Sequence, residues 1–304
     1  MVSDLSRAQL LRLLHITREL KAVPRQGRAS QLMAGLTLGL LFEKPSTRTR
    51  VSFEAAMNQM GGQALFLSTD TIQLSRGESL ADTALVLSRY LDGLVVRTFA
   101  QSTLREWARH STIPVLNGLT DSGHPCQALA DLFTISEKKG DLKGLKFTYI
   151  GDGNNIANSL LETCALMGIS MSVGCPPEYE PDQKITEWAR GVAQQSGATI
   201  DITHDPRLAA KDSDVLYTDV WTSMGQEKEQ AKRIKILAPY QLNEQILSGA
   251  KPDALVMHCL PAHRGEEISA SVLDGPQSVV LDQAENRLHM QKAILTEWLG
   301  RPWS

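Results

Sequence analysis

The sequence predicts an α/β fold with two domains, each a parallel β-sheet flanked by helices. Short apolar runs rich in β-branched residues alternate along the chain with segments of helical spacing, which is typical of βα units. The chain has 304 residues, 42% of them hydrophobic and 21% charged, and this length fits two hydrophobic cores more readily than one. In such folds we expect functional residues at the carboxyl ends of the strands.

Seven short apolar runs are expected to be strands, at residues 36–42, 93–99, 146–152, 169–175, 214–221, 254–261 and 277–284. The segments between them have helical spacing, as in "SLADTALVLSRYLDG" and "NSLLETCALMG". A polar segment, "ISEKKGDLKG" at 135–144, separates the two series of runs. We therefore place the domain boundary there, with 1–134 before it and 135–285 after it.

Charge and cysteine content exclude several functional classes. The net charge of −3 gives no general attraction to nucleic acid or to anionic membranes, and no apolar run has membrane-spanning length. The four cysteines include no C-x-x-C pair, which argues against a disulfide framework and a structural zinc site. The charged, amphipathic N-terminus does not resemble a signal sequence. We expect a cytoplasmic protein that binds neither nucleic acid nor membranes.

The first candidate site is "EKPSTRTRVSFEAAM" at 43–57, directly after the first strand. Ser46 can cap a helix that ends near Gly61 and Gly62. Two arginines, Arg48 and Arg50, then fall in the first turn, where the helix macrodipole disfavours exposed cations by about 0.3–1 kcal/mol. A bound anion would reverse this effect.

The hydroxyls of Ser46, Thr47 and Thr49 could join the first-turn N–H groups and Arg48 around one phosphate. Arg50 lies about 200° further around the helix, so an ion pair within the chain or a part in closing the site is expected for it. The alternative is an ordinary capped helix with solvated arginines.

The second motif is "DSGHPCQALADLF" at 121–133. His124 at a strand-to-helix turn can donate a hydrogen bond to a developing oxyanion, and Gln127 could reach the same pocket. Taken alone, this motif favours the alternative that His124 is a turn residue whose hydrogen bonds are satisfied locally.

The third motif, "GDGNNIANS" at 151–159, begins like a dinucleotide fingerprint but has Ile156 where that motif requires Gly or Ala. It is therefore a weak cofactor signal. Asn154 and Asn155 could instead hold a zwitterionic head group. A glycine-rich turn with asparagines in left-handed backbone is the alternative.

The fourth motif, "YTDVWTSMGQEKEQAKR" at 217–233, ends a strand with Asp219, where an acid can pair with a substrate cation. Ser223 and Gln226 form a capping-box pattern. The fifth, "MHCLPAHRGEE" at 257–267, places Cys259 at a strand end.

A catalytic Cys/His pair in the fifth motif is disfavoured, although His258 and His263 lie close to Cys259 in sequence. Adjacent residues of a strand point to opposite faces, so His258 is not expected to activate the thiol. Cys259 without an activating base would not act as a nucleophile.

Taken together, these motifs resemble those of ornithine carbamoyltransferases, in the aspartate/ornithine transcarbamoylase family. The resemblance spans nearly the whole chain and rests on "FEKPSTRTR", "HPCQ", "GDGNN", "DVWTSMGQE", "HCLP" and "AENRLHMQKAIL". It implies transfer of the carbamoyl group of carbamoyl phosphate to the δ-amine of L-ornithine, giving L-citrulline and phosphate. It also implies a transcarbamoylase-like fold with the active site in the interdomain cleft, a homotrimer with shared active sites, and no metal or organic cofactor.

The resemblance assigns residues 1–134 to carbamoyl phosphate binding and 135–285 to ornithine binding, with a helix at 286–304 packing back on the first domain. It implies that carbamoyl phosphate contacts residues of several motifs, namely Ser46, Thr47, Arg48, Thr49, Gln73, Arg97, His124, Gln127, Cys259, Leu260 and Arg287. Gln73 would come from a neighbouring subunit. Ornithine would contact Asn155, Asp219, Ser223 and Met224. Catalytic roles fall to Arg97, His124, Cys259, Asp219 and Arg287.

Three alternatives remain at this point. The first is a transcarbamoylase with another acceptor, such as putrescine, N-acetylornithine or aspartate. The second is an NAD-dependent dehydrogenase, motivated by "GDGNNI" and the parallel-sheet pattern. The third is a non-enzymatic binding protein on the same scaffold, which is disfavoured because every catalytic-type side chain is present.

Overall fold

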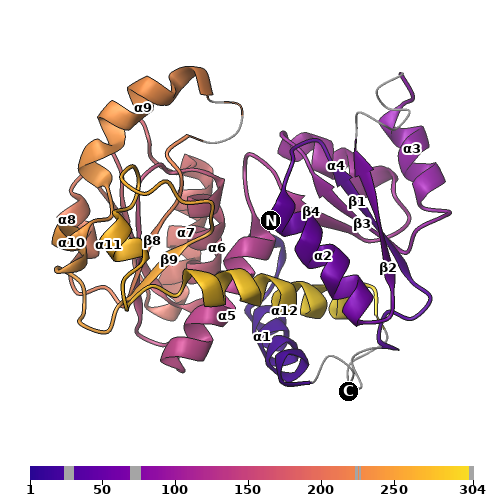
Figure 1. Cartoon of the computed structure of the whole chain (residues 1–304), viewed down its shortest axis with the longest axis horizontal. Helices are drawn as coiled ribbons and strands as arrows, with labels where there is room; N and C mark the ends of the chain where they lie inside the picture. Colours follow the sequence, from indigo (N-terminus) through magenta and orange to yellow (C-terminus); the bar gives the residue numbers. More distant parts are fainter. Residues whose placement is uncertain (24–30, 69–76, 223–224, 226, 301–304) are drawn as a thin grey trace. The chain divides into compact units, whose positions relative to one another are not determined.

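The computed structural model describes residues 1–23, 31–68, 77–222, 225 and 227–300 (Figure 1). These residues form two compact units. Unit 1 contains Met1, residues 8–126 and the chain from Arg287 onward, whereas unit 2 contains Val2–Arg7 and Gln127–Asn286. The division falls within two helices, α5 (Pro125–Lys139) and α12 (Val280–Trp298).

Unit 1 is built on a four-stranded parallel sheet in the order β2-β1-β3-β4. Its strands are β1 (Thr37–Phe42), β2 (Gln63–Ser68), β3 (Gly93–Arg97) and β4 (Val115–Leu119). Its helices are α1 (Arg7–Ala22), α2 (Thr47–Gln59), α3 (Leu80–Leu87) and α4 (Gln101–His110). The strands β1 and β3 at its centre are almost completely buried, and Trp107 of α4 packs in the core they form.

Unit 2 is built on a five-stranded parallel sheet in the order β7-β6-β5-β8-β9. Its strands are β5 (Lys146–Ile150), β6 (Ser170–Gly174), β7 (Ile200–Thr203), β8 (Val215–Thr218) and β9 (Leu255–His258). Its α-helices are α6 (Asn155–Met167), α7 (Gln183–Ser196), α8 (Pro206–Ala210), α9 (Gln230–Leu237), α10 (Glu244–Leu247) and α11 (Ala270–Leu273). Short 3-10 turns are η1 (Val2–Asp4), η5 (Glu227–Glu229) and η6 (Ala238–Tyr240).

The predicted α/β class, with two parallel sheets flanked by helices, is confirmed. Six of the seven predicted strands are present, each within a few residues of its predicted bounds. The strand predicted at 277–284 is wrong, because α12 begins at Val280 and only an isolated bridge joins Ser278 to Val256. Val280 packs in the core of unit 2, but the next residue, Leu281, is 78% exposed, which a buried strand would not allow. A short apolar run cannot by itself distinguish a strand from a first helical turn.

Strand order decides where a ligand can bind in each sheet. In unit 1 the chain moves from β1 outward to β2 and then returns to β3 on the other side, and in unit 2 the same reversal separates β5 from β8. Parallel sheets bind ligands beyond the carboxyl ends of the strands at such reversals. The expected positions are therefore the loops that follow β1 and β3 in unit 1, and β5 and β8 in unit 2.

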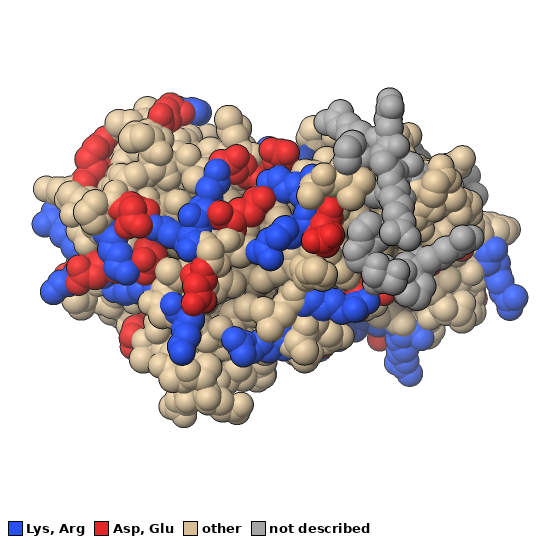
Figure 2. Space-filling model, turned by 90° about the horizontal axis from the view of Figure 1, so that it is seen from below, with Lys and Arg blue, Asp and Glu red and all other residues tan. Residues whose placement is uncertain are grey.

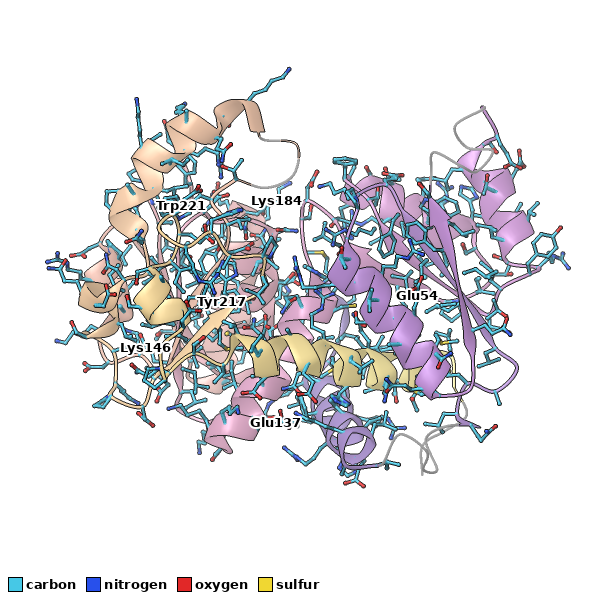
Figure 3. The ribbon with its side chains drawn as sticks, viewed as in Figure 1. Glu54, Glu137, Lys146, Lys184, Tyr217 and Trp221 are labelled. Carbon is cyan, nitrogen blue, oxygen red and sulfur yellow. The ribbon has the colours of Figure 1, made fainter. Side chains whose placement is uncertain are left out.

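Buried side chains stabilise each unit separately. In unit 2, Tyr217 stacks on Tyr149 at a ring-centroid distance of 6.0 Å and lies 5.9 Å from Phe147, and all three rings are buried. Figure 3 shows Tyr217 among the side chains of the unit 2 sheet. Burial of a large apolar side chain contributes about 1.5–3 kcal/mol, so these rings fix the strands that carry the site loops.

The molecular surface carries both signs of charge. Figure 2 shows one face on which Lys and Arg side chains are interspersed with Asp and Glu side chains, as expected for a net charge of −3. Within the described residues, no helix combines the length and the apolar character needed to cross a membrane. Because the net charge of −3 gives no general attraction to anions, a site for an anion must be built from local groups.

Candidate active site

The loop after β1 carries the first candidate residues on the N-terminus of α2. Ser46 is the N-cap in extended backbone, and its hydroxyl accepts a hydrogen bond from the N–H of Thr49 at 3.2 Å. The helix ends at Gln59 with Met60 as its C-cap, as the glycines after it predicted. Thr47 and Arg48 are exposed, whereas Thr49 is buried. The cap leaves first-turn N–H groups and Arg48 available to an anion at this helix end.

Arg50 has a different environment from Arg48. Its Nε donates to Glu54 Oε1 at 2.9 Å, one helical turn later, and its guanidinium lies 3.9 Å from the ring centroid of Phe66. Figure 3 labels Glu54 on α2. The ion pair predicted for Arg50 is confirmed, and this arginine is held on the side of the helix that faces β2.

Buried positive charge gathers near His124, in the turn before α5. Arg97 at the end of β3, Arg287 in α12 and His124 are only 7%, 4% and 4% exposed. Burial, and next the positive charges of Arg287 and Arg97, hold the pKa of His124 well below its usual range, and Arg48 acts in the same direction. The imidazole is thus neutral near pH 7 and can donate a hydrogen bond without adding charge.

Arg287 is fixed by Thr49 within unit 1. Its Nη2 donates to the Thr49 hydroxyl at 2.8 Å, so a residue of α12 is joined to the first turn of α2. Two buried guanidiniums and the positive end of α2 give this part of unit 1 a local positive potential, which favours the binding of an anion.

The loops after β1, β3 and β4 are tied to one another by two residues that precede Ser46. Lys44 is buried, forms an ion pair with Asp121, and lies 4.2 Å from the ring centroid of Phe99. Glu43 accepts a hydrogen bond from the Thr98 hydroxyl. These contacts set the spacing between the first-turn residues of α2, Arg97 and the turn that carries His124.

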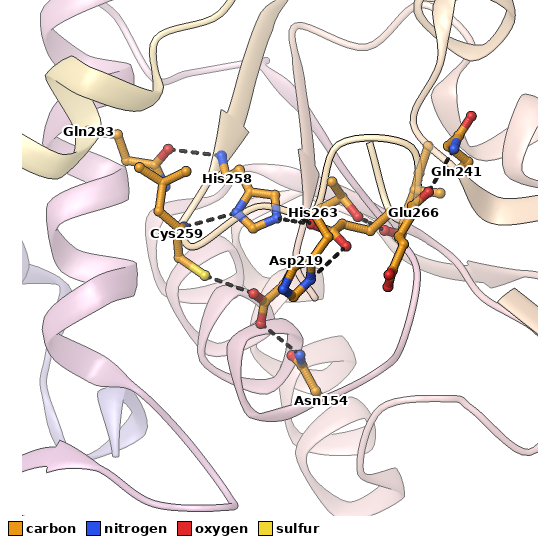
Figure 4. A network of polar contacts seen from close by, with 12 residues as sticks. Asn154, Asp219, Gln241, His258, Cys259, His263, Glu266 and Gln283 are labelled. Atoms are coloured by element: carbon orange, nitrogen blue, oxygen red, sulfur yellow. Dashed lines mark hydrogen bonds and ion pairs between the residues drawn. The ribbon is translucent and has the colours of Figure 1, made fainter. Parts of the chain in front are cut away.

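In unit 2 the central group is Asp219, which directly follows β8 and is 6% exposed. Its Oδ2 accepts a hydrogen bond from Asn154 Nδ2 at 2.8 Å, and its Oδ1 accepts one from Cys259 Sγ at 2.9 Å (Figure 4). Asn154 caps α6 through the N–H groups of Ile156 and Ala157. The carboxylate is therefore oriented from both sides at the β5/β8 reversal, where it can bind a cationic amine.

His258 holds the backbone after β9 and does not form a pair with Cys259. Its Nδ1 accepts from the Leu260 N–H at 2.9 Å, while its Nε2 lies 3.2 Å from a carboxylate oxygen of buried Glu267. Because Nδ1 accepts a hydrogen bond, Nε2 is the nitrogen that donates to Glu267. Burial acts to raise the pKa of Glu267, but hydrogen bonds from His258 and His263 dominate and lower it.

The Leu260 backbone has φ 57°, which is uncommon for a residue with a side chain, and a cis bond joins it to Pro261. The Cys259 thiol donates a hydrogen bond to Asp219. These contacts agree with the sequence prediction that Cys259 is not the nucleophile of a Cys/His pair.

A buried amide and carboxylate network joins α5, β8 and α12 in unit 2. Gln127 Nε2 and Gln283 Nε2 each donate to Asp131 Oδ1 at 2.8 Å, and the Tyr217 hydroxyl donates to Asp131 Oδ2 at 3.1 Å. Gln283 Oε1 accepts from the His258 N–H at 2.9 Å. The network orients Gln127 and fixes the start of the "HCLP" segment. Sequence reasoning missed Gln283, because 277–284 was predicted as a strand.

Two family models cover this chain. The model described as "Aspartate/ornithine carbamoyltransferase, carbamoyl-P binding domain" matches residues 1–137, and the "Asp/Orn binding domain" model of the same family matches 143–297. The chain belongs to the aspartate/ornithine carbamoyltransferase family. An ornithine carbamoyltransferase of Syntrophus aciditrophicus is 54% identical over 97% of this chain and 96% of its own length. One named anabolic, from Pyrococcus furiosus, is 50% identical over 98% and 95%.

Solved structures of carbamoyltransferases agree with the observed fold. The Pyrococcus furiosus enzyme superimposes with a TM-score of 0.93 at 48% identity, covering 98% of this chain and 96% of that one. An anabolic ornithine carbamoyltransferase of Campylobacter jejuni has a TM-score of 0.91 at 41% identity, covering 97% and 96%.

The glycines of "GDGNN" have a structural explanation in this carbamoyltransferase. A Cβ on Gly153 would lie 2.2 Å from the backbone nitrogen of Pro181, and Gly151 has φ +132°. Close backbone approach and positive φ therefore require glycine at these positions, and the resemblance to a dinucleotide fingerprint needs no cofactor. Asn155 is the first residue of α6 and is partly exposed.

The structure brings the predicted carbamoyltransferase residues together in two groups. Unit 1 carries Ser46, Thr47, Arg48, Thr49, Arg97, His124 and Arg287 at the ends of β1 and β3 and on neighbouring elements. Unit 2 carries Gln127, Asn155, Asp219, Cys259 and Leu260. Gln73, Ser223 and Met224 lie outside the described residues, as does Gln226.

Proposed function

We propose that this protein transfers the carbamoyl group of carbamoyl phosphate to the δ-amine of L-ornithine, forming L-citrulline and phosphate. The observation that carries the proposal is the group of buried Arg97, Arg287 and neutral His124 beside the capped end of α2. Family membership and the names of the relatives support the same reaction. We assign residues 1–134 with the helix at 286–304 to carbamoyl phosphate, and 135–285 to ornithine.

Carbamoyl phosphate binding rests on charge and on helix geometry. The phosphate group accepts hydrogen bonds from Ser46, Thr47, Arg48 and Thr49 and from the free N–H groups of the first turn of α2. Arg97 and Arg287 neutralise the remaining charge. The carbamoyl NH₂ donates to Gln127 and to the carbonyl oxygens of Cys259 and Leu260.

Ornithine binding rests on Asp219, whose carboxylate is already oriented by Asn154 and Cys259. We assign the α-amino and α-carboxylate groups of ornithine to Asn155, Asp219, Ser223 and Met224. The Cys259 thiol, close to the same carboxylate, helps to orient the attacking δ-amine.

The reaction follows from positioning and electrostatics. The neutral δ-amine attacks the carbonyl carbon, and Arg97, His124 and Thr49 stabilise the resulting oxyanion by hydrogen bonding. The lowered pKa of His124 keeps its imidazole a neutral hydrogen-bond donor near pH 7. The C–O bond to phosphate then breaks, and the leaving phosphate carries away the amine proton. These steps require no metal or organic cofactor.

The assembly and cellular role are also part of the proposal. We assign a homotrimer in which Gln73 of a neighbouring subunit completes each active site, in the cytoplasm. The name of the Pyrococcus furiosus relative, which includes "anabolic", favours a role in arginine biosynthesis.

A single acceptor screen tests the reaction. Purified protein is incubated with carbamoyl phosphate and, separately, ornithine, N-acetylornithine, putrescine, lysine or aspartate, and carbamoylated product and phosphate are measured. Ornithine should give citrulline at the highest kcat/KM, because only it offers both the zwitterionic head group and the δ-amine. Turnover of another acceptor in place of ornithine would refute the acceptor assignment, and saturable NADH binding would favour the dehydrogenase alternative.

A further inference from the structure

The turn that follows the "HCLP" segment contains three side chains that could bind a metal ion. His263, Glu266 and Glu267 each offer a ligand atom, and these atoms all lie within 4.8 Å of one another. The proposed reaction uses neither His263 nor Glu266. In the sequence, His263 is a candidate only as a partner for Cys259, so this cluster has no assigned role.

The backbone of this turn is held in place by its own hydrogen bonds. The Glu266 N–H donates to the His263 carbonyl at 2.9 Å, and the Gly265 N–H donates to the Ile268 carbonyl at 2.8 Å. The Gln241 side chain donates to the carbonyl oxygens of Gly265 and Glu266 at 2.9 and 2.8 Å (Figure 4). The side chains of the cluster therefore start from a fixed backbone, which reduces the entropy lost when they converge on an ion.

Glu267 gives an independent indication that a cation belongs here. Its side chain is completely buried, and its Oε1 contacts His258 Nε2 and accepts from the His263 N–H. Among the described residues its other oxygen, Oε2, accepts no hydrogen bond, and it lies 3.5 Å from His263 Nδ1. A buried carboxylate oxygen without a hydrogen bond destabilises the folded state, and a cation at this point would remove that cost.

We propose that His263, Glu266 and Glu267 bind one divalent transition-metal ion, with Zn²⁺ as the best match. One imidazole nitrogen and two carboxylate oxygens form a donor set that suits zinc, whereas Mg²⁺ and Ca²⁺ prefer oxygen ligands alone. Ligands about 2.0–2.1 Å from a tetrahedral ion lie roughly 3.4 Å apart, close to the 3.5 Å between His263 Nδ1 and Glu267 Oε2. The contact between Glu267 and His258 orients the inner ligand, as is usual at metal sites.

Solvent access and a comparison with a second group of possible ligands both favour this cluster as the metal site. The His263 side chain is 52% exposed and Glu266 is partly exposed, so an ion can reach the site from solvent. A second group, Asp219, His258 and Cys259, also has its ligand atoms close together. There, however, Cys259 already donates to Asp219, and both nitrogens of His258 contact other groups. Binding at that group would have to break these contacts first.

A bound ion would act on the turn and not on the reacting atoms. Glu267 contacts His258, and His258 accepts from the Leu260 N–H. An ion on Glu267 would therefore stabilise the segment from Leu260 to Glu267 without taking part in carbamoyl transfer. Metal binding is thus independent of the proposed catalytic function and can be measured without it.

The test measures Zn²⁺ binding by the untagged full-length protein after removal of metal with a chelator. Equilibrium dialysis followed by elemental analysis should give one Zn²⁺ per chain. His263→Ala and Glu266→Gln should each weaken binding by about tenfold or more, equivalent to 1.4 kcal/mol. Both side chains are at least partly exposed, so these variants should fold. Cys259→Ala should retain binding, and Co²⁺ should bind without a thiolate charge-transfer band.

A matched control is His110→Ala. His110 lies 3.3 Å from Glu106 on the surface of α4, and within the described residues this histidine–carboxylate pair belongs to no group of three possible metal ligands. This variant should bind Zn²⁺ as the wild type does. Absence of binding at micromolar Zn²⁺ would overturn the proposal. So would loss of binding in Cys259→Ala with retention in His263→Ala, because the ion would then occupy the Asp219 group.

Discussion

Replacing Arg233 with methionine should destabilise unit 2 more at pH 8 than at pH 5. Arg233 lies on α9 and is 6% exposed. Its Nη2 forms an ion pair with Asp152, its Nε donates to the Trp221 carbonyl at 2.5 Å, and its guanidinium lies 4.9 Å from the Tyr179 ring centroid. Methionine retains much of the apolar stem and removes the charge.

The size of the effect follows from the burial of Asp152, which is 8% exposed. Burial raises the pKa of Asp152 to about 6, and the Arg233 charge opposes this rise. Without Arg233 the pKa must move further upward. Removing one partner of a buried ion pair costs about 3–5 kcal/mol while the other stays charged. This cost is therefore largest at high pH, where Asp152 is charged.

At pH 5 Asp152 binds a proton in the folded variant, which removes the buried unpaired charge. A carboxyl whose folded pKa is raised favours the folded state at low pH, and this contribution is lost as pH rises through the folded pKa. Each unit of pKa corresponds to about 1.4 kcal/mol. For Arg233→Met we therefore expect a loss of about 3–5 kcal/mol at pH 8 and roughly half of that at pH 5.

Urea unfolding followed by tryptophan fluorescence at both pH values measures these free energies. Lys235→Met, an exposed position on the same helix, is the matched control and should change stability by less than about 0.5 kcal/mol. Adding Asp152→Asn to Arg233→Met should recover most of the loss at pH 8. An equal loss at both pH values, or no recovery in the double variant, would refute the reasoning.

Two further pairs of variants test the site and the fold. Arg48→Ala should weaken carbamoyl phosphate binding, measured by calorimetry, by at least about tenfold. Arg50→Ala should bind carbamoyl phosphate normally and lose only about 0.3–0.5 kcal/mol of stability, because it loses its helical ion pair. Normal binding by Arg48→Ala would contradict the phosphate assignment. Gly153→Ala should destabilise by about 1–3 kcal/mol or more, because its Cβ would lie 2.2 Å from Pro181. Gly191→Ala, in α7 with nothing within 4 Å, should stabilise by about 0.5–1 kcal/mol; thermal unfolding showing the same sign for both would contradict the packing argument.

The sequence predicted the position of most site residues relative to single strands. Ser46 and Asp219 follow runs that are strands in the structure, and parallel strands place such residues at one edge of their sheet. The order of the strands could not be predicted from the sequence, because pairing between strands that are distant in the chain leaves no local pattern. That order decides that the loops after β1 and β3 are neighbours, and that Asn154 reaches Asp219.

Long-range polar contacts were the other part that sequence patterns could not supply. Asp131 accepts a hydrogen bond from Gln283, which is 152 positions away, and no local sequence pattern predicts this pairing. The edge strand β2 was also missed, because its residues are mostly half exposed and its apolar pattern is weak. No sequence pattern distinguishes Glu267 from the neighbouring acid Glu266, and the structure shows that Glu267 is completely buried.

The contacts of Glu43 and Lys44 mean that three loops of unit 1 cannot change independently. Lys44 fixes the loop after β4 through Asp121, and Glu43 fixes the loop after β3 through Thr98. An insertion or deletion in one loop would therefore displace groups in the other two. An engineer who transplants the "STRTR" loop together with Glu43 and Lys44 should therefore also exchange Thr98 and Asp121, because these contacts couple the three loops.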